Sequence, residues 1–178
     1  YGGDRHTRIQ QEFVLGVGGV RALEELGIKP SVYHINEGHA AFMVLERVRR
    51  KVMSSALSFH AALEAVAAST VFTTHTPVPA GHDHFAEDMI WDYFGQCCSD
   101  LNIPREEFMR LGGVGHGQDF NMTKLALHGS RHHNGVSRIH GGVSARICAD
   151  MWPQVTPQES PMEYITNGVH VSTVLAQE

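Results

Sequence analysis

The stretch TVFTT, residues 70–74, organises this chain, because all five residues are β-branched or aromatic. Such residues favour a strand, and a short run bounded by turn residues is typical of a buried strand. Pro77 and Pro79 end it, because proline cannot donate a ladder hydrogen bond. Shorter strand patterns lie on either side of it in the sequence, over residues 32–35 and 164–166.

Apolar residues at steps of three and four predict helices between these strands. The expected helices cover residues 5–26, 39–54, 58–68, 84–99, 104–111, 121–127 and 136–147. On the second helix, Glu46 is placed to pair with Arg49 or Arg50. Helices that alternate with strands predict an α/β fold with a mostly parallel sheet flanked by helices. Three strands are few for a complete doubly wound domain, so we interpret the chain as a fragment.

The composition excludes several classes of protein. The 14 Lys and Arg residues against 19 Asp and Glu give a net charge of -5 without a basic stripe, which argues against a nucleic-acid partner. No apolar run reaches the roughly 18 residues that a membrane span needs. Three cysteines, Cys97, Cys98 and Cys148, do not make a disulfide framework, so we expect a reducing, cytoplasmic location.

Polar residues follow each predicted strand at the end where a parallel sheet binds ligands. The first strand runs into Asn-Glu-Gly-His at residues 36–39, and the second runs into Thr-His-Thr at residues 74–76. The third runs into Thr-Asn-Gly-Val-His at residues 166–170. Together with the high count of 13 histidines, these strand ends predict a site for a polar ligand.

Other clusters have simpler interpretations. Glycines at residues 16–19 and 113–117 resemble phosphate loops, but neither group joins a strand to a helix. We expect close helix packing for the first group and a flexible loop for the second. The histidines of residues 82–84 and 132–133 lack the spacing that puts two imidazoles on one helical face, so we interpret them as surface-loop residues and expect no metal. Cys148 is expected in the core.

Several runs of the chain match one family in order. They are residues 1–4 (YGGD), 8–13 (RIQQEF), 34–39 (HINEGH), 73–76 (TTHT), 120–123 (FNMT), 125–127 (LAL), 129–140 (GSRHHNGVSRIH) and 165–169 (ITNGV). In this order they resemble the α-glucan phosphorylases, the glycogen and maltodextrin phosphorylase family (glycosyltransferase family 35). Glu37 and Gly38 stand where the better-known animal and plant enzymes have Asp and Thr, and this version resembles the shorter bacterial branch.

The resemblance implies a partial Rossmann-like domain, with residues 1–178 as a fragment of the N-terminal domain of a GT-B enzyme. It implies phosphorolysis of an α-1,4-glucan to glucose 1-phosphate with retention, so that glucan and inorganic phosphate are the partners, in a possible homo-oligomer. It also implies pyridoxal 5'-phosphate in the full-length protein. Lys29, Lys51 and Lys124 are not in the family's coenzyme motif. We therefore expect coenzyme and phosphate to bind to a C-terminal domain that is absent here, and no activity from the chain alone.

Position by position, the resemblance assigns site residues. His75 matches the catalytic-site histidine that contacts the reacting sugar, and Asn167 matches the asparagine that holds the O6 hydroxyl. Glu37 and His39 match an acid and a histidine near the acceptor side of the cleft. Asp4 belongs to the run that begins a loop gating the active site. The resemblance implies no cofactor-binding residue and no metal ligand in this chain.

Three other functions remain open. A nucleotide-sugar-dependent GT-B glycosyltransferase would carry a nucleotide site in place of the coenzyme. A non-catalytic carbohydrate-binding module would display aromatic platforms for sugars, yet Trp91 and Trp152 are expected in apolar helical contexts. A His-rich metal-binding module would be revealed by metal analysis.

Overall fold

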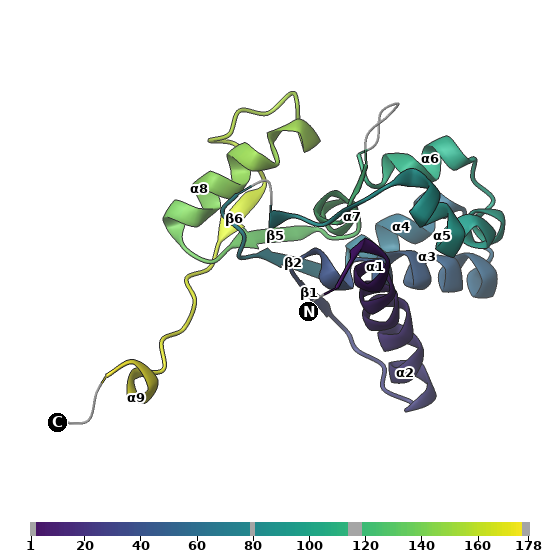
Figure 1. The fold of residues 1–178 in the computed structure, drawn as a ribbon, viewed down its shortest axis with the longest axis horizontal. Coiled ribbons are helices and arrows are strands. Elements are labelled where there is room, and N and C mark those ends of the chain that lie inside the picture. Colours follow the sequence, from purple (N-terminus) through teal and green to yellow (C-terminus); the bar gives the residue numbers. More distant parts are fainter. Residues whose placement is uncertain (1–2, 79–80, 114–118, 176–178) are drawn as a thin grey trace.

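The computed structural model of the chain describes residues 3–78, 81–113 and 119–175 (Figure 1). Its main sheet has four strands in the order β1-β2-β5-β6, and every neighbouring pair is parallel. The strands are β1 (Tyr33–Asn36), β2 (Thr70–Thr74), β5 (His132–Gly135) and β6 (Met162–Tyr164). A separate antiparallel ribbon pairs β3 (His84–Phe85) with β4 (Phe120–Asn121). The predicted α/β fold with a parallel sheet is confirmed.

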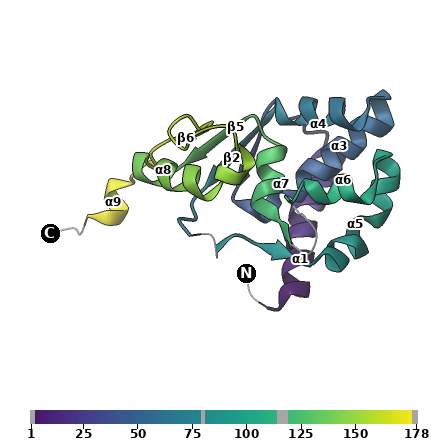
Figure 2. The same cartoon turned by 90° about the horizontal axis from the view of Figure 1, so that it is seen from above.

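Helices fill the connections between the strands. They are α1 (Arg5–Phe13), α2 (Gly19–Glu25), α3 (Phe42–Ser55), α4 (Phe59–Ala67), α5 (Glu87–Leu101), α6 (Arg105–Arg110), α7 (Met122–His128), α8 (Arg138–Ile147) and α9 (Val171–Val174). Figure 2 shows α3 to α7 gathered on one side of the molecule, with α8 on the other side beside β5 and β6. Among the described residues, no helix combines the length and the apolar character needed to cross a membrane.

The strand predictions need three corrections, the first being that β3 and β4 were not predicted and that β3 occupies residues expected to begin a helix. β5 was not expected, because its residues His-His-Asn-Gly lack the β-branched and aromatic pattern of a strand. It forms between β2 and β6, where pairing on both sides supplies what intrinsic propensity does not. Its residue His133 is buried, so the surface-loop interpretation of residues 132–133 was wrong for that histidine. The last strand lies over residues 162–164 rather than 164–166.

The predicted N-terminal helix is a continuous helical segment that contains a π-helical turn, Val14–Gly18, between α1 and α2. Gly16 lies in this turn against the start of α3. A Cβ atom on Gly16 would approach the backbone nitrogen of Met43 to 2.8 Å and Cβ of Phe42 to 2.9 Å. The predicted role of these glycines in close helix packing is therefore confirmed for Gly16.

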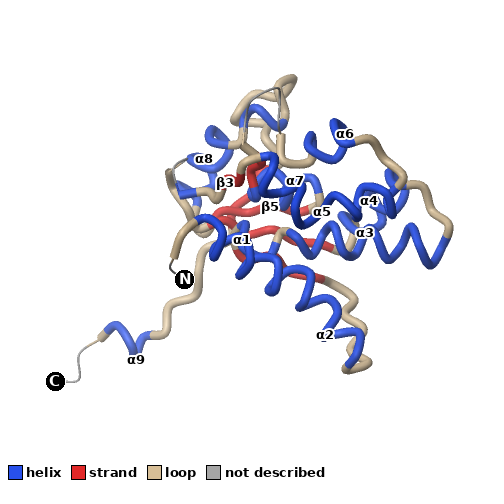
Figure 3. The backbone as a smooth tube through the Cα atoms, turned by 45° about the vertical axis from the view of Figure 1, so that its right-hand side comes forward, coloured by secondary structure: helices blue, strands red, loops and turns tan. Residues whose placement is uncertain are grey.

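Phenyl rings join the helices on the α3 side. The ring centroids of Phe42 and Phe94 are 4.6 Å apart, and Phe94 lies 6.0 Å from Phe108. Phe108 in turn lies 6.2 Å from Phe120, so the row of rings links α3, α5, α6 and the β3–β4 ribbon. Cys148 is also buried, as predicted. Figure 3 shows the strands enclosed by helices, with α9 standing apart at the end of an extended segment.

Two glycines of the N-terminal helical segment give a matched test of this packing. We expect Gly16→Ala to lower the free energy of unfolding by about 1–3 kcal/mol, because the added methyl group meets backbone atoms of α3 that cannot move aside. Gly19→Ala has open space around the new methyl group, so it should raise the free energy of unfolding by up to about 1 kcal/mol through helix propensity. Urea unfolding of both variants measures this, and equal effects would contradict the packing.

Candidate active site

The candidate site lies at the carboxyl edge of the main sheet, where the parallel strands end together. Asn36 pairs with Thr73, and Thr74 pairs with Gly135, which in turn pairs with Tyr164. The polar segments that follow β1, β2 and β6 therefore emerge at one edge, as the sequence predicted. This is the edge at which open α/β sheets bind ligands.

Glu37 joins the end of β1 to the loop that follows β2. Its backbone N–H donates to the carbonyl oxygen of Thr73 at 2.9 Å, and its carboxylate accepts from the backbone N–H of His75. The hydroxyl of Thr76 donates to the same carboxylate oxygen at 3.3 Å. Glu37 is 9% exposed. Its carboxylate is thus used largely within the protein, to fix the position of the backbone at His75.

The backbone of Glu37 is strained. Its φ of 62° and ψ of 178° fall in a region that is essentially restricted to glycine and that costs of order 1–3 kcal/mol for other residues. The following residues turn at once into a 3-10 helix, Gly38–Ala40, that leads to α3. The strain is held in place by the hydrogen bonds that Glu37 makes to the end of β2.

His75 is exposed at this edge, and its imidazole is oriented by Asn36. The Nε2 atom of His75 lies 3.0 Å from Oδ1 of Asn36. An amide oxygen only accepts hydrogen bonds, so this contact assigns the proton of the neutral ring to Nε2. Nδ1 then carries a lone pair that can accept from a hydroxyl group. The sequence pattern predicted Asn36 at the site but did not indicate this role.

A row of hydrogen bonds crosses three strands just before the edge. Nε2 of His34 lies 2.7 Å from Oγ1 of Thr73, and that hydroxyl donates to Oδ1 of Asn134 at 2.9 Å. Because the Thr73 proton is used toward Asn134, Nε2 of His34 is the donor to Thr73. Thr73 and Asn134 are both buried. The row stiffens the support of the site and was not anticipated from the sequence, because its three members lie in different segments.

Asn167 reaches the same edge through β6. Its backbone N–H donates to the carbonyl oxygen of Val136 at 3.2 Å, which continues the β5–β6 pairing beyond the last strand. The residue is exposed. β5 lies between β2 and β6, so Asn167 follows a strand about 10 Å from the strand of His75 at the usual strand spacing. His75 and Asn167 are therefore brought to one edge although they are 92 residues apart in sequence.

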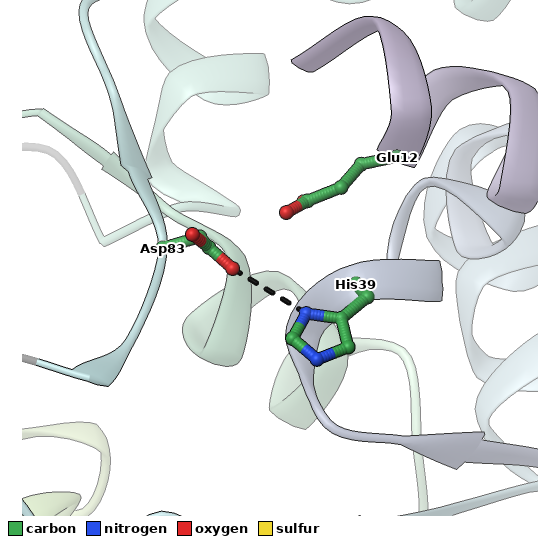
Figure 4. A group of neighbouring side chains, drawn as sticks. All are labelled: Glu12, His39 and Asp83. Carbon is green, nitrogen blue, oxygen red and sulfur yellow. Dashed lines mark ion pairs between the residues drawn. The ribbon is translucent and has the colours of Figure 1, made fainter. Parts of the chain in front are cut away.

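His39 lies in a separate cluster with Arg8, Glu12 and Asp83. Nη2 of Arg8 donates to Oδ2 of Asp83 at 2.8 Å and lies 2.9 Å from Nδ1 of His39. Nε of Arg8 lies 2.9 Å from Oε1 of Glu12. Figure 4 shows the Glu12, His39 and Asp83 side chains pointing toward one another from three different segments, with the 3.4 Å contact between Asp83 and His39 dashed. Since Arg8 can only donate, Nδ1 of the neutral His39 ring is an acceptor.

The two carboxyl groups of this cluster have opposite pKa shifts. Burial of Glu12, which is 0% exposed, raises its pKa to about 9, and the neighbouring negative charge of Asp83 adds to the rise. Burial also acts to raise the pKa of Asp83, but the hydrogen bonds from Arg8 and Glu12 outweigh it and lower that pKa. One guanidinium thus keeps Asp83 ionised, while Glu12 holds a proton at neutral pH.

The ligand atoms of Glu12, His39 and Asp83 lie within 4.8 Å of one another, which is close enough to share a cation. Arg8 already places a positive charge among them, so we interpret the group as a polar network around the Arg8–Asp83 ion pair. The surface-loop interpretation of residues 82–84 was wrong for His82, which is buried with Nδ1 2.6 Å from Oγ1 of Thr123. Asp83 is only partly exposed and belongs to the network.

Asp4 is the N-cap of α1. Its carboxylate accepts from the backbone N–H of Thr7 at 2.8 Å, and this hydrogen bond lowers the pKa of Asp4. Residues 1–4 were predicted to begin a loop that gates the site, and residues 1–2 of this run lie outside the described residues. Residues 114–118 of the second glycine-rich segment and Pro79 also lie outside them.

None of the three lysines is placed to hold a coenzyme aldehyde at this edge. Lys29 and Lys51 line a pocket at the amino ends of β1 and β2, at the opposite edge of the sheet. Lys124 is ion-paired with Asp150.

The buried Glu12 predicts a specific pH dependence of stability. Its pKa is about 9 in the folded chain and near the ordinary glutamate value of 4.5 when unfolded, so the folded state binds more protons between those values. The free energy of unfolding should therefore fall as the pH rises from about 5 to 9, by up to about 1.4 kcal/mol per pH unit from this group. Glu12→Gln, which resembles the protonated form, should remove that part of the slope.

Chemical unfolding at several pH values between 5 and 9 measures this slope. Glu64→Gln is the matched control, because the Glu64 side chain is 73% exposed and its substitution should leave the slope as it is in the wild type. Parallel curves for the wild type and Glu12→Gln would contradict the protonated state of Glu12.

Curated relatives cover the whole chain. Glycogen phosphorylase of Mycobacterium tuberculosis is 41% identical over an alignment of 189 positions that covers 100% of this chain and 22% of that protein. Maltodextrin phosphorylase of Thermococcus litoralis is 43% identical over 178 residues, again 100% of this chain and 21% of that protein. Glycogen phosphorylase of Aquifex aeolicus is 31% identical over 98% of this chain and 25% of its own length. No protein-family model matches the chain.

The chain thus spans about a fifth of the length of the first two relatives. Their names do not favour a nucleotide-sugar transferase or a binding module. Nor do the two tryptophans offer open sugar platforms, since the Arg105 guanidinium covers Trp91 at 4.5 Å and Trp152 packs against His133 at 5.5 Å. The resemblance predicted from the motifs is confirmed: along its whole length, the chain is related to a segment of the glycogen and maltodextrin phosphorylases.

Proposed function

We propose that this chain is part of an α-glucan phosphorylase, which cleaves an α-1,4-glucan with inorganic phosphate and releases glucose 1-phosphate with retention. The observation that carries the proposal is the similarity of this chain, along its whole length, to a segment of glycogen and maltodextrin phosphorylases, at 41–43% identity. The carboxyl edge of the sheet supports it, because His75 and Asn167 are exposed there next to a rigid hydrogen-bonded support.

In this proposal, His75 and Asn167 bind the glucosyl unit that is transferred. The Nδ1 lone pair of His75 accepts a hydrogen bond from a sugar hydroxyl, and the Asn167 amide can donate or accept. The backbone carbonyl of His75 faces the reacting carbon, where positive charge develops in an oxocarbenium-like transition state. Asn36 holds the imidazole in the required tautomer.

Glu37 acts here as a positioning residue. Its carboxylate is engaged by the His75 backbone N–H and by Thr76, so it fixes the carbonyl and the side chain of His75 relative to β1. With Glu37, His39 lies toward the glucan acceptor side of the cleft, and Asp4 belongs to the start of the loop that gates the site. The network of Arg8, Glu12 and Asp83 fixes the orientation of the His39 ring.

The domain assignment follows from the same proposal. Residues 1–178 form part of the N-terminal domain of a GT-B enzyme, and the rest of the protein holds the phosphate substrate and pyridoxal phosphate. When bound, this coenzyme supplies an acid–base group, its phosphate, next to the substrate phosphate. The enzyme acts in the cytoplasm, where glucan, phosphate and reduced cysteines occur together, and it can form a homo-oligomer.

The direct test is phosphorolysis by the full-length protein that contains this chain. With pyridoxal phosphate loaded, the wild type should release glucose 1-phosphate from maltodextrin and phosphate. His75→Ala should lower kcat by about 10²-fold or more, because the substitution removes a group that contacts the reacting sugar. Asn36→Ala should lower kcat less, because it only frees the His75 ring.

His132→Ala is the matched control, since His132 is exposed at the opposite end of the sheet and should leave kcat unchanged. The isolated chain should release no glucose 1-phosphate. A folded, coenzyme-loaded protein without phosphorolysis, or a His75→Ala variant as active as the wild type, would refute the proposal.

A further inference from the structure

A basic pocket of about 360 Å³ lies between α2, α3 and the amino-terminal ends of β1 and β2. We call it the α2–α3 pocket. Tyr33 opens β1 and Ser69 precedes β2, so this pocket lies at the opposite edge of the sheet from His75 and Asn167. Its charged and hydroxyl-bearing lining residues, apart from Tyr33, are Glu24, Lys29, Arg47, Arg50, Lys51 and Ser69.

The charge of this lining is opposite to that of the chain. Four cationic side chains and one carboxylate line the pocket, whereas the chain as a whole carries a net charge of -5. The carboxylate, Glu24, is already ion-paired with Arg50. The pocket therefore concentrates positive charge in a protein that is otherwise acidic.

Arg47 is a buried cation without an anionic partner among the described residues. It is 8% exposed. Nη1 donates to Oγ1 of Thr70 and Nη2 donates to Oγ of Ser69, both at 2.6 Å, and both acceptors are neutral hydroxyls. Its guanidinium lies 3.7 Å from the centroid of the Tyr33 ring. These contacts fix the guanidinium firmly in the wall of the pocket.

The neighbouring arginines of α3 differ from Arg47 in this respect. Arg49 and Arg50 both bind the buried carboxylate of Glu46 at 2.9 Å, as the sequence predicted, and Arg21 of α2 binds it too. Glu46 is thus fully used by three guanidinium groups. The Glu-Arg-Val-Arg-Arg sequence places Arg47 away from this network and toward the α2–α3 pocket.

A buried guanidinium cannot lose its charge at physiological pH, so its burial has to be compensated by neighbouring groups. Hydroxyls compensate it only in part, and an unpaired buried charge is costly. An anion in the pocket would supply the missing charge. Arginine is well suited to such an anion, because its planar guanidinium can donate two parallel hydrogen bonds to two oxygen atoms of one phosphate group.

We propose that the α2–α3 pocket binds a small phosphate-class anion, held by Arg47, Lys29 and Lys51 of its lining. The shared chemistry is a phosphoryl group, either of inorganic phosphate or of a phosphomonoester. Val20, Ile28 and Pro30 also line the pocket, so an ester with an apolar part binds more tightly than inorganic phosphate alone. The site is distinct from the candidate active site and does not depend on the proposed function.

The test is calorimetric titration of the 178-residue chain with inorganic phosphate and with phenyl phosphate, at constant ionic strength. Both probes should bind saturably, and phenyl phosphate should bind more tightly. The double variant Lys29→Gln/Lys51→Gln should weaken both by about tenfold, which corresponds to about 1.4 kcal/mol. Arg47→Met should abolish binding if the variant still folds, as judged by circular dichroism.

Two controls keep the outcome decisive even if Arg47→Met does not fold. Arg131→Gln removes an exposed cation outside the pocket, and His75→Ala alters the candidate active site, so both should bind the probes as the wild type does. The proposal is overturned if neither probe binds saturably. It is also overturned if the lysine double variant binds as tightly as the wild type, or if His75→Ala loses binding to the same extent.

Discussion

The carboxylate of Glu37 connects the end of β1 to the backbone of His75, and the arrangement of the candidate site depends on this contact. The contact requires a backbone conformation that is essentially restricted to glycine, so the strain must be offset by the hydrogen bonds that Glu37 makes. A shorter side chain or a relaxed backbone would leave the loop after β2 without a fixed position. The same residue also begins the turn into α3, whose packing against Gly16 anchors the N-terminal helical segment.

Two hydrogen-bonded groups support this edge, one within the sheet and one around His39. The row of His34, Thr73 and Asn134 ties together three parallel strands one or two residues before they end. The cluster of Arg8 and Glu12 on α1, together with Asp83 from the segment before β3, holds His39. Rigid support of this kind is what a site needs when it recognises hydroxyl groups, because a misplaced polar partner is left unpaired at a cost of about 1–3 kcal/mol. The opposite edge of the sheet, with the α2–α3 pocket, is chemically different and carries an excess of positive charge.

The sequence predicted most of the fold because its helices are amphipathic and its second strand is rich in β-branched residues. It did not predict β5, whose His-His-Asn-Gly residues form a strand only because β2 and β6 pair with them on both sides. The positions of Glu37, His75 and Asn167 at one edge were predictable from the rule for parallel sheets. Three other features were not predictable: the burial of His82, the protonation of Glu12, and the burial of Arg47 without a carboxylate partner among the described residues. Each depends on contacts between segments distant in sequence.

The contact between Glu37 and His75 can be tested by hydrogen exchange of the His75 backbone amide, measured by NMR in the 178-residue chain. This amide should be protected in the wild type and should exchange about tenfold faster or more in Glu37→Ala, since a hydrogen bond to a charged group contributes about 1.5–3 kcal/mol. Glu64→Ala, at an exposed carboxylate, should leave the His75 amide as protected as in the wild type. Equal protection in Glu37→Ala and the wild type would contradict the central role of Glu37.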